Sequence, residues 1–292
     1  MRASSERPVT GHRPGLPILD LFAERWRLGR FVCVGLDTAY ERLPGAATSG
    51  RSVEQGLVWF NQSIVDATQS VACAFKPNIA FYEGHGPDGL RALEHTVRYI
   101  KSAYPEIPVI LDAKRGDIGS SNVGYVRAAF ERIRADAITV SPYLGREALA
   151  PFLARSDRGV FVLAKTSNPG AGEFQDLRVG AEQVPLYLVV ARQVATRWND
   201  NNNCGVVAGA THPADLAAIR SVVGDMPILV PGVGAQGAAI GPAVRAGRNS
   251  SGGGLIINSS RDILYASGEA DYAVAAERAA RRLNHEITAN LI

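Results

Sequence analysis

Residues 109–122 read VILDAKRGDIGSSN, and they place Asp112, Lys114 and Asp117 directly after a short apolar run. Such a run is long enough for a buried strand, and side chains two apart on a strand point to the same face. We therefore expect Asp112 and Lys114 to project together, while Gly116 lets the chain turn and bring Asp117 back. Neighbouring carboxylates keep a lysine protonated at pH 7. An ammonium held beside a carboxylate is suited to protonating a carbanion, whereas the alternative is a surface turn with solvated charges.

The composition argues against nucleic-acid-binding, membrane-spanning and disulfide-rich proteins. The chain has 292 residues with a formal net charge of +3, which is too weak to argue for nucleic-acid or membrane partners. No apolar run reaches the roughly 18 residues of a membrane span. Cys33, Cys73 and Cys204 lie far apart, which indicates buried thiols rather than disulfides or a zinc site. The polar start lacks a signal core, so we expect a cytoplasmic protein with a flexible tail at 1–15 before one domain at 16–292.

Short apolar runs alternate with amphipathic or alanine-rich stretches along the whole chain. The expected strands are 31–37, 72–78, 109–114, 137–142, 160–166, 205–210, 227–232 and 254–259. The expected helices are 52–70, 88–103, 122–134, 145–154, 184–200, 212–222, 236–246 and about 269–288. This alternation predicts an α/β protein with a closed (β/α)8 (TIM) barrel, and an open doubly wound sheet is the alternative. The long polar stretch 167–183 is expected to be an irregular, functional loop.

Polar side chains gather where these strands end, which is where barrel enzymes place their active sites. The strand ends carry Asp37, Lys76, Asp112 with Lys114, Ser141, Lys165 with Ser167, Thr211, Gln236 and Arg261. Any one of them is explained equally well as a solvated loop residue. The convergent set favours a site at this end of the barrel.

Two neighbouring segments suit a phosphate. Residues 228–237 contain G-x-G-x-x-G, but this motif follows the seventh strand and has no acidic residue about 20 positions on, so a dinucleotide site is rejected. Its glycines still let backbone N–H groups approach an anion, and Gln236 adds a donor. Residues 258–261 supply hydroxyls and the guanidinium of Arg261. A phosphate site is predicted here, and the alternative is that the glycines serve only a tight turn.

Several segments together resemble the orotidine 5′-phosphate decarboxylase family, in its longer-chain bacterial branch, over about residues 31–265. They are D-x-K-x-x-D at 112–117, PGVGAQG at 231–237, SNPGAGEF at 167–174, FKPNIAFYE at 75–83 and ITVSPYLG at 138–145. The resemblance implies that orotidine 5′-monophosphate is converted to UMP and CO2, the last step of de novo pyrimidine synthesis. It implies no metal and no organic cofactor.

The resemblance also implies a role for each matching residue. Lys114 would protonate C6 of the pyrimidine, Asp112 would lie near the substrate carboxylate, and Asp117 would come from the other subunit of a homodimer. Asp37 and Lys76 would bind the ribose and extend the charge network. The other implied substrate contacts are Ile118, Ser121 across the dimer to the ribose, Ser167 at the pyrimidine amide, Pro231 as an apolar wall, and Gln236 and Arg261 at the phosphate.

Two rival functions remain. Sugar-phosphate enzymes of the same suprafamily share D-x-K-x-x-D but hold magnesium with an acidic residue after the second strand. Here Lys76 takes that position, and it would repel a cation. A non-catalytic nucleotide-binding barrel would keep the phosphate residues but would not need Lys114.

Overall fold

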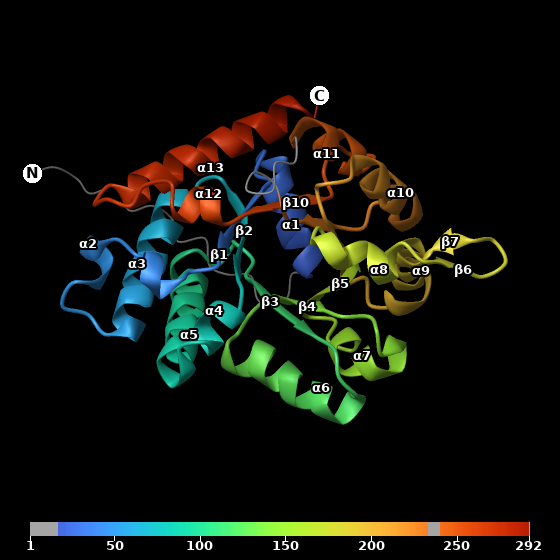
Figure 1. The fold of residues 1–292 in the computed structure, drawn as a ribbon, viewed down its shortest axis with the longest axis horizontal. Helices are drawn as coiled ribbons and strands as arrows, with labels where there is room; N and C mark the ends of the chain where they lie inside the picture. The colour runs from blue at the N-terminus through green and yellow to red at the C-terminus, as the bar shows by residue number, and fades with distance from the viewer. Residues whose placement is uncertain (1–16, 233–239, 292) are drawn as a thin grey trace, which may run out of the picture.

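The computed structural model describes residues 17–232 and 240–291, in which helices surround a parallel β-barrel (Figure 1). Hydrogen-bonded ladders join the strands in the order β2-β1-β10-β9-β8-β5-β4-β3. A parallel bridge from Asn78 to Asp112, with a 3.2 Å bond from the Ile79 N–H to the Asp112 carbonyl, brings β2 beside β3. The strands are β1 (Val32–Leu36), β2 (Ala72–Pro77), β3 (Ile110–Arg115), β4 (Ala137–Val140), β5 (Gly159–Lys165), β8 (Cys204–Ala208), β9 (Ile228–Val230) and β10 (Leu255–Ser259). The barrel prediction is confirmed, because an open sheet would leave β2 and β3 at separate edges.

The helices alternate with the strands much as the sequence predicts. The main ones are α3 (Val53–Thr68), α5 (Gly86–Ala103), α6 (Gly119–Val126) running on into the π-helical η2 (Arg127–Arg132), α7 (Gly145–Leu153), α9 (Leu186–Gln193) running on into η4 (Val194–Trp198), α10 (Pro213–Val223), α11 (Ile240–Gly247) and α13 (Tyr272–Ala289). Short turns of helix at the strand ends are η1 (Tyr40–Arg42), α2 (Gly45–Thr48), α4 (Ala80–Glu83), η3 (Pro169–Ala171), α8 (Gly172–Gln175) and α12 (Arg261–Leu264). In the described part of the chain, no helix is both long and apolar enough to cross a bilayer.

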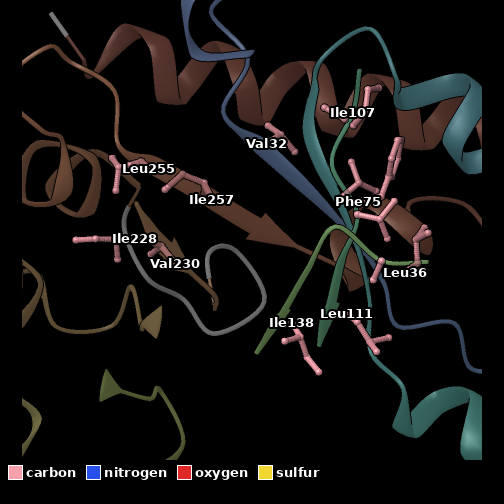
Figure 2. Packing of buried hydrophobic residues seen from close by; sticks show 14 of the residues in the cluster. Val32, Leu36, Phe75, Ile107, Leu111, Ile138, Ile228, Val230, Leu255 and Ile257 are labelled. Carbon is pink, nitrogen blue, oxygen red and sulfur yellow. The ribbon is translucent and has the colours of Figure 1, made fainter. Parts of the chain in front are cut away.

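The apolar core has two parts. The larger cluster lies between the strands and the surrounding helices and includes Val32, Phe75 and Ile138 (Figure 2). The smaller cluster fills the barrel interior, where an additional helix, α1 (Ile18–Arg27), inserts Phe22 edge-on against Phe161 with ring centroids 6.0 Å apart. The sequence did not predict α1. Its burial closes the end of the barrel opposite the strand carboxyl ends.

All three cysteines are buried and outside any disulfide, as the sequence predicts. Cys33 and Cys73 belong to the barrel interior, and Cys204 packs in the outer cluster. Burial raises the pKa of Cys33 to about 12 and that of Cys204 to about 12, so both stay protonated thiols at neutral pH.

The stretch 167–183 is more ordered than expected. Instead of an irregular loop, it forms η3, α8 and β6 (Arg178–Val179), and β6 pairs in a small antiparallel hairpin with β7 (Val184–Pro185), which follows directly. The hairpin extends from the edge of the molecule in Figure 1. The polar composition that suggested a loop reflects its exposure rather than a lack of structure.

The asparagine-rich segment after η4 has a structural role. The Asn201 side chain donates to the Leu153 carbonyl at 2.8 Å, and that of Asn203 donates to the carbonyls of Arg155 and Arg158 at 3.0 Å each. Asn199 accepts from the Cys204 N–H at 2.9 Å. These bonds tie the start of β8 to the end of α7 and to the turn that leads into β5.

Candidate active site

Side chains of alternating charge converge at the carboxyl ends of β1, β2 and β3. Lys114 Nζ donates to Asp112 Oδ1 at 2.6 Å, and Lys76 Nζ donates to Asp112 Oδ2 at 2.9 Å. Lys76 Nζ also lies 3.9 Å from Asp37 Oδ1. The order Asp37–Lys76–Asp112–Lys114 therefore forms one continuous charge network, and the sequence predicted all four members.

Burial and charge act in opposite directions on this network. Burial by itself would lower the pKa of Lys76, but the carboxylates of Asp112 and Asp37 outweigh it and raise that pKa above its usual value. Burial would likewise raise the pKa of Asp112, but Lys76 and Lys114 hold it well below its usual range. Both groups therefore stay charged at neutral pH. The Lys114 side chain is 49% exposed, so its ammonium remains open on the side away from Asp112.

The β3–β4 ladder is irregular where these residues lie. Its register runs from Leu111 opposite Ile138 directly to Arg115 opposite Val140. Within this break Lys114 has a φ of +46°, a left-handed conformation that is uncommon for a residue other than glycine. Gly116 is needed for a different reason from the expected one. A Cβ atom there would lie 2.7 Å from the Ser141 carbonyl oxygen, so close approach to the segment after β4, not a positive φ, requires glycine.

A cavity of about 360 Å³ opens over the network, within the size range of small-molecule sites. Six of the predicted residues line it, namely Asp37, Lys76, Asp112, Ser167, Pro231 and Arg261. A second pocket extends it over Lys114 and Thr139 and shares Lys76, Asp112, Ser167 and Pro231 with the first. The structure thus brings most of the predicted strand-end residues to one place.

One end of the cavity is suited to a phosphate. Gly232, Ser259, Ser260 and Arg261 line it together. Arg42 lines it as well, with its guanidinium 3.8 Å from the centre of the Tyr265 ring. Sequence reasoning missed Arg42, because it lies beyond the end of β1 and no motif marks it. Gln236, the other predicted phosphate ligand, falls outside the described residues.

Two acceptor oxygens in the cavity wall have no hydrogen-bond partner among the described residues. They are Oδ1 of Asp37 and Oδ1 of Asn258, and both atoms are buried. Buried acceptors are normally satisfied, so these two are suited to hydroxyl or N–H donors of a bound molecule. Ribose hydroxyls are donors of this kind.

The segment that carries Ser167 is fixed by α8. The Thr166 N–H donates to Gln175 Oε1 at 2.8 Å, and Gln175 Nε2 donates back to Thr166 Oγ1 at 2.9 Å. Lys165, which was expected among the convergent residues, is buried and pairs with Asp176. In the described part of the chain, Ser141, Lys165 and Thr211 do not line either cavity.

Three predicted site residues lie away from their own barrel's cavity. Asp117 Oδ1 accepts from the Ile118 N–H at 2.6 Å, and among the described residues Asp117 makes no ion pair with Lys114. Ile118 is 58% exposed, and Ser121 is exposed as well. Asn122 fixes this turn by donating to the carbonyls of Asp117 and Ala148 at 2.7 and 2.6 Å. Within one chain, Lys114 therefore pairs with Asp112 and not with Asp117.

A parallel barrel with this charge network beside a phosphate-suited end defines a barrel enzyme that acts on a small phosphorylated molecule. The model of the orotidine 5′-phosphate decarboxylase / HUMPS family matches residues 30–278, and the chain belongs to that family. Within residues 17–232 and 240–291, no group of three or more His, Cys, Asp or Glu side chains is arranged to hold a metal ion.

Similar proteins show which members of this family the chain resembles. A relative from Cellvibrio japonicus named orotidine 5′-phosphate decarboxylase is 49% identical over 88% of this chain and 92% of its own length. One from Azoarcus sp. with the same name is 50% identical over 88% of this chain and 93% of its own length. The solved structure of Leishmania donovani OMP decarboxylase covers 93% of this chain and 99% of its own, with 36% identity and a TM-score of 0.79. The chain thus lies on the decarboxylase side of the family.

Proposed function

We propose that this chain converts orotidine 5′-monophosphate to UMP and CO2, the last step of pyrimidine nucleotide synthesis, with Lys114 as the proton donor. The observation that carries the proposal is the Lys114 ammonium, 2.6 Å from Asp112 and open toward the cavity. The reaction is inferred from the names of the decarboxylase relatives, and the residues that would carry it out are inferred from the geometry of the cavity.

The chemistry requires a fixed cation. Departure of CO2 breaks the bond to C6 and leaves its electron pair on that carbon, where no adjacent carbonyl delocalises it. The protein must stabilise this charge electrostatically and deliver a proton, which the Lys114 ammonium does as the pair becomes the new C6–H bond. Because Asp112 already holds that ammonium, and Lys76 in turn holds Asp112, little reorganisation is needed during the reaction.

Asp112 also acts on the substrate carboxylate. Two like charges about 4 Å apart repel by roughly 4 kcal/mol at an effective dielectric constant of about 20. The repulsion disappears as CO2 leaves, so it favours the transition state over bound substrate. The low pKa of Asp112 keeps it charged for this role.

The cavity orients the rest of the substrate. In the proposed pose the phosphate lies toward Arg261, and the ribose hydroxyls donate to Asp37; Gln236 stays a phosphate ligand predicted from the sequence alone. The pyrimidine lies toward Ser167 and against Pro231. Arg261, Asp37 and Ser167 all line one cavity, so a single nucleotide can contact all three.

We further propose a homodimer in which Asp117, Ile118 and Ser121 enter the partner's site. Lys114 is half-exposed and has room for a second carboxylate. Exposed apolar side chains surround the same loops, namely Ile118 (58%), Val123 (42%), Tyr143 (84%) and Leu144 (44%). Clustered exposed apolar residues are typical of an interface.

The domain boundaries at 1–15 and 16–292 and a cytoplasmic location stay predictions.

The magnesium-dependent alternative is disfavoured by Lys76. Its buried ammonium bonds directly to Asp112 at 2.9 Å, in the place where such an enzyme would need an acidic ligand. The non-catalytic alternative is disfavoured by Lys114, whose placement over the cavity serves no purpose in phosphate binding.

Loss of orotate absorbance on adding the protein to orotidine 5′-monophosphate tests the function. Lys114→Ala should lower kcat by at least about 100-fold, the usual scale for losing a positioned general acid. Lys101→Ala is the matched control, because Lys101 pairs with Asp136 at the opposite end of β4. Full activity of Lys114→Ala would overturn the mechanism. Turnover of a ketose phosphate that a chelator abolishes would instead favour the magnesium-dependent alternative.

A further inference from the structure

A threonine on β4 lies at the centre of the hydrogen bonds around Asp112 and Lys114. Thr139 is 1% exposed, and its Oγ1 donates to Asp112 Oδ1 at 2.9 Å. The same oxygen accepts the N–H groups of Ala113 and Lys114 at 3.0 Å each. A hydroxyl offers one donor and two acceptor positions, so this one is fully used.

The hydroxyl replaces missing ladder bonds. Between the pairs Leu111–Ile138 and Arg115–Val140, three residues of β3 face only Thr139 on β4. A regular ladder cannot satisfy the N–H groups of so long a bulge, and buried N–H groups need a partner. Thr139 supplies it from its side chain.

Lys114 depends on this arrangement more than its neighbours do. Its φ of +46° is unfavourable for a residue with a side chain, so surrounding contacts must hold it there. The bond from its N–H to Thr139 is such a contact, and it links the backbone of the lysine to the carboxylate that binds its Nζ.

We propose that Thr139 is a positioning residue, whose hydroxyl fixes the Asp112 carboxylate and the left-handed backbone of Lys114 so that the Lys114 ammonium is held at the reacting carbon. This inference rests on the proposed function. Nothing in the sequence pattern marked Thr139, because threonine is an ordinary residue in a buried strand. Its role is visible only in the structure, where the bulge of β3 lies opposite it and donates two N–H groups to its hydroxyl.

Three variants separate the hydroxyl from the shape of the side chain. Thr139→Val keeps the volume but removes the hydroxyl, whereas Thr139→Ser keeps the hydroxyl and removes a methyl group. Thr139→Ala removes both and avoids any clash if the valine variant folds poorly. Thr68→Val is the matched control, because Thr68 is also fully buried and its hydroxyl donates to the Ile64 carbonyl at 2.7 Å, within α3.

The readouts are kcat and KM per folded enzyme, the melting temperature, and exchange of the C6 proton of UMP in deuterated water, which reports the proton transfer in reverse. We expect Thr139→Val and Thr139→Ala to lower kcat and C6 exchange by about 10- to 100-fold with KM changed less than about threefold. Thr139→Ser should stay within about threefold of wild type. Thr68→Val should lose stability without losing kcat.

The opposite results are equally clear. Thr139→Val with kcat within threefold of wild type would overturn the proposal, as would a serine variant as slow as the valine variant. A crystal structure of Thr139→Val that keeps the Lys114 φ near +46° and its bond to Asp112 would do the same. If wild type itself does not consume orotidine 5′-monophosphate, the proposed function fails, and that crystal structure still decides the role of Thr139.

Discussion

At the scale of single residues, Asp112 is the most connected group of the site. Its carboxylate accepts from Lys114 and Thr139 on one oxygen and from Lys76 on the other. These donors come from three strands, so one carboxylate joins β2, β3 and β4 at their carboxyl ends. Its charge is therefore expected to matter to stability as well as to the proposed catalysis.

Asp112→Asn should lower the free energy of unfolding at pH 7 by about 3 kcal/mol, because Lys76 and Lys114 lose their shared partner. The pKa of Asp112 lies below its ordinary 3.8, so its contribution is present above about pH 4 and is lost as the pH falls toward the folded-state pKa. Urea denaturation at several pH values should show the difference from wild type shrinking below pH 4.

Asp157→Asn is the control for this variant, since its pair with Arg155 is largely exposed and worth less than about 1 kcal/mol. A difference for Asp112→Asn that is as large at pH 2.5 as at pH 7 would contradict the assignment. Lys76 shows the opposite pH dependence, because its pKa is raised in the folded protein. Its contribution to the free energy of unfolding therefore persists up to the ordinary lysine pKa of 10.5 and is lost only at higher pH.

At the scale of elements, two segments that line the cavity are each held by a neighbouring element in which no sequence motif was recognised. The bulge of β3 depends on Thr139 of β4, and the segment after β5 depends on α8 through Gln175. Asp176 adds an ion pair to Lys165 at the end of β5. α8 therefore positions Ser167 although it does not line the cavity.

Gln175→Leu should lower kcat/KM by about 10-fold, mainly through KM, because Thr166 loses two bonds and Ser167 is less well placed. The melting temperature should change by less than about 3 °C, since the segment is at the surface. Gln193→Leu on α9 serves as the matched control. Steady-state kinetics on wild type and both variants test this prediction. If Gln175→Leu has the same kcat/KM as Gln193→Leu, α8 does not position Ser167.

At the scale of the whole molecule, the proposed homodimer implies that one chain completes only part of the site. Asp112 and Lys114 face their own cavity, while Asp117 lies on the exposed turn beside Ile118. A two-fold dimer would exchange these turns between the two barrels. In that arrangement the dimer would be required for catalysis and not only for stability.

Mixing two inactive variants tests this arrangement. If Asp117 serves the partner's site, a heterodimer of Lys114→Ala with Asp117→Asn contains one intact site. Random exchange makes half of the dimers mixed, so activity should recover to about a quarter of wild type. Lys114→Ala mixed with Asp112→Asn should recover nothing, because both residues serve their own barrel. No recovery in the first mixture would place Asp117 in its own site.

Local patterns along the chain predicted a large part of this protein. Apolar runs alternating with amphipathic stretches predicted the eight strands of the barrel. A strand that is buried on both faces is a continuous apolar run, so it can be recognised from local composition alone. The spacing of Asp112 and Lys114, and the polar residues after each strand, predicted the cavity wall. Strand ends are adjacent in any such barrel, so no knowledge of side-chain packing was needed.

Long-range packing decided the rest. α1 closes one end of the barrel and inserts Phe22, Thr139 accepts the N–H groups of the β3 bulge, and Arg42 lines the cavity over Tyr265. Lys165 turns from the cavity to Asp176, and Gly116 is required by a neighbouring strand end. Each of these depends on contacts between segments far apart in the chain or on the exact path of a loop. Sequence by itself determined that the charged groups at the carboxyl ends of β1, β2 and β3 meet at one end of the barrel. Only the tertiary structure decided which other charged groups join them and which contacts hold each one in place, because those contacts depend on the packing of distant segments.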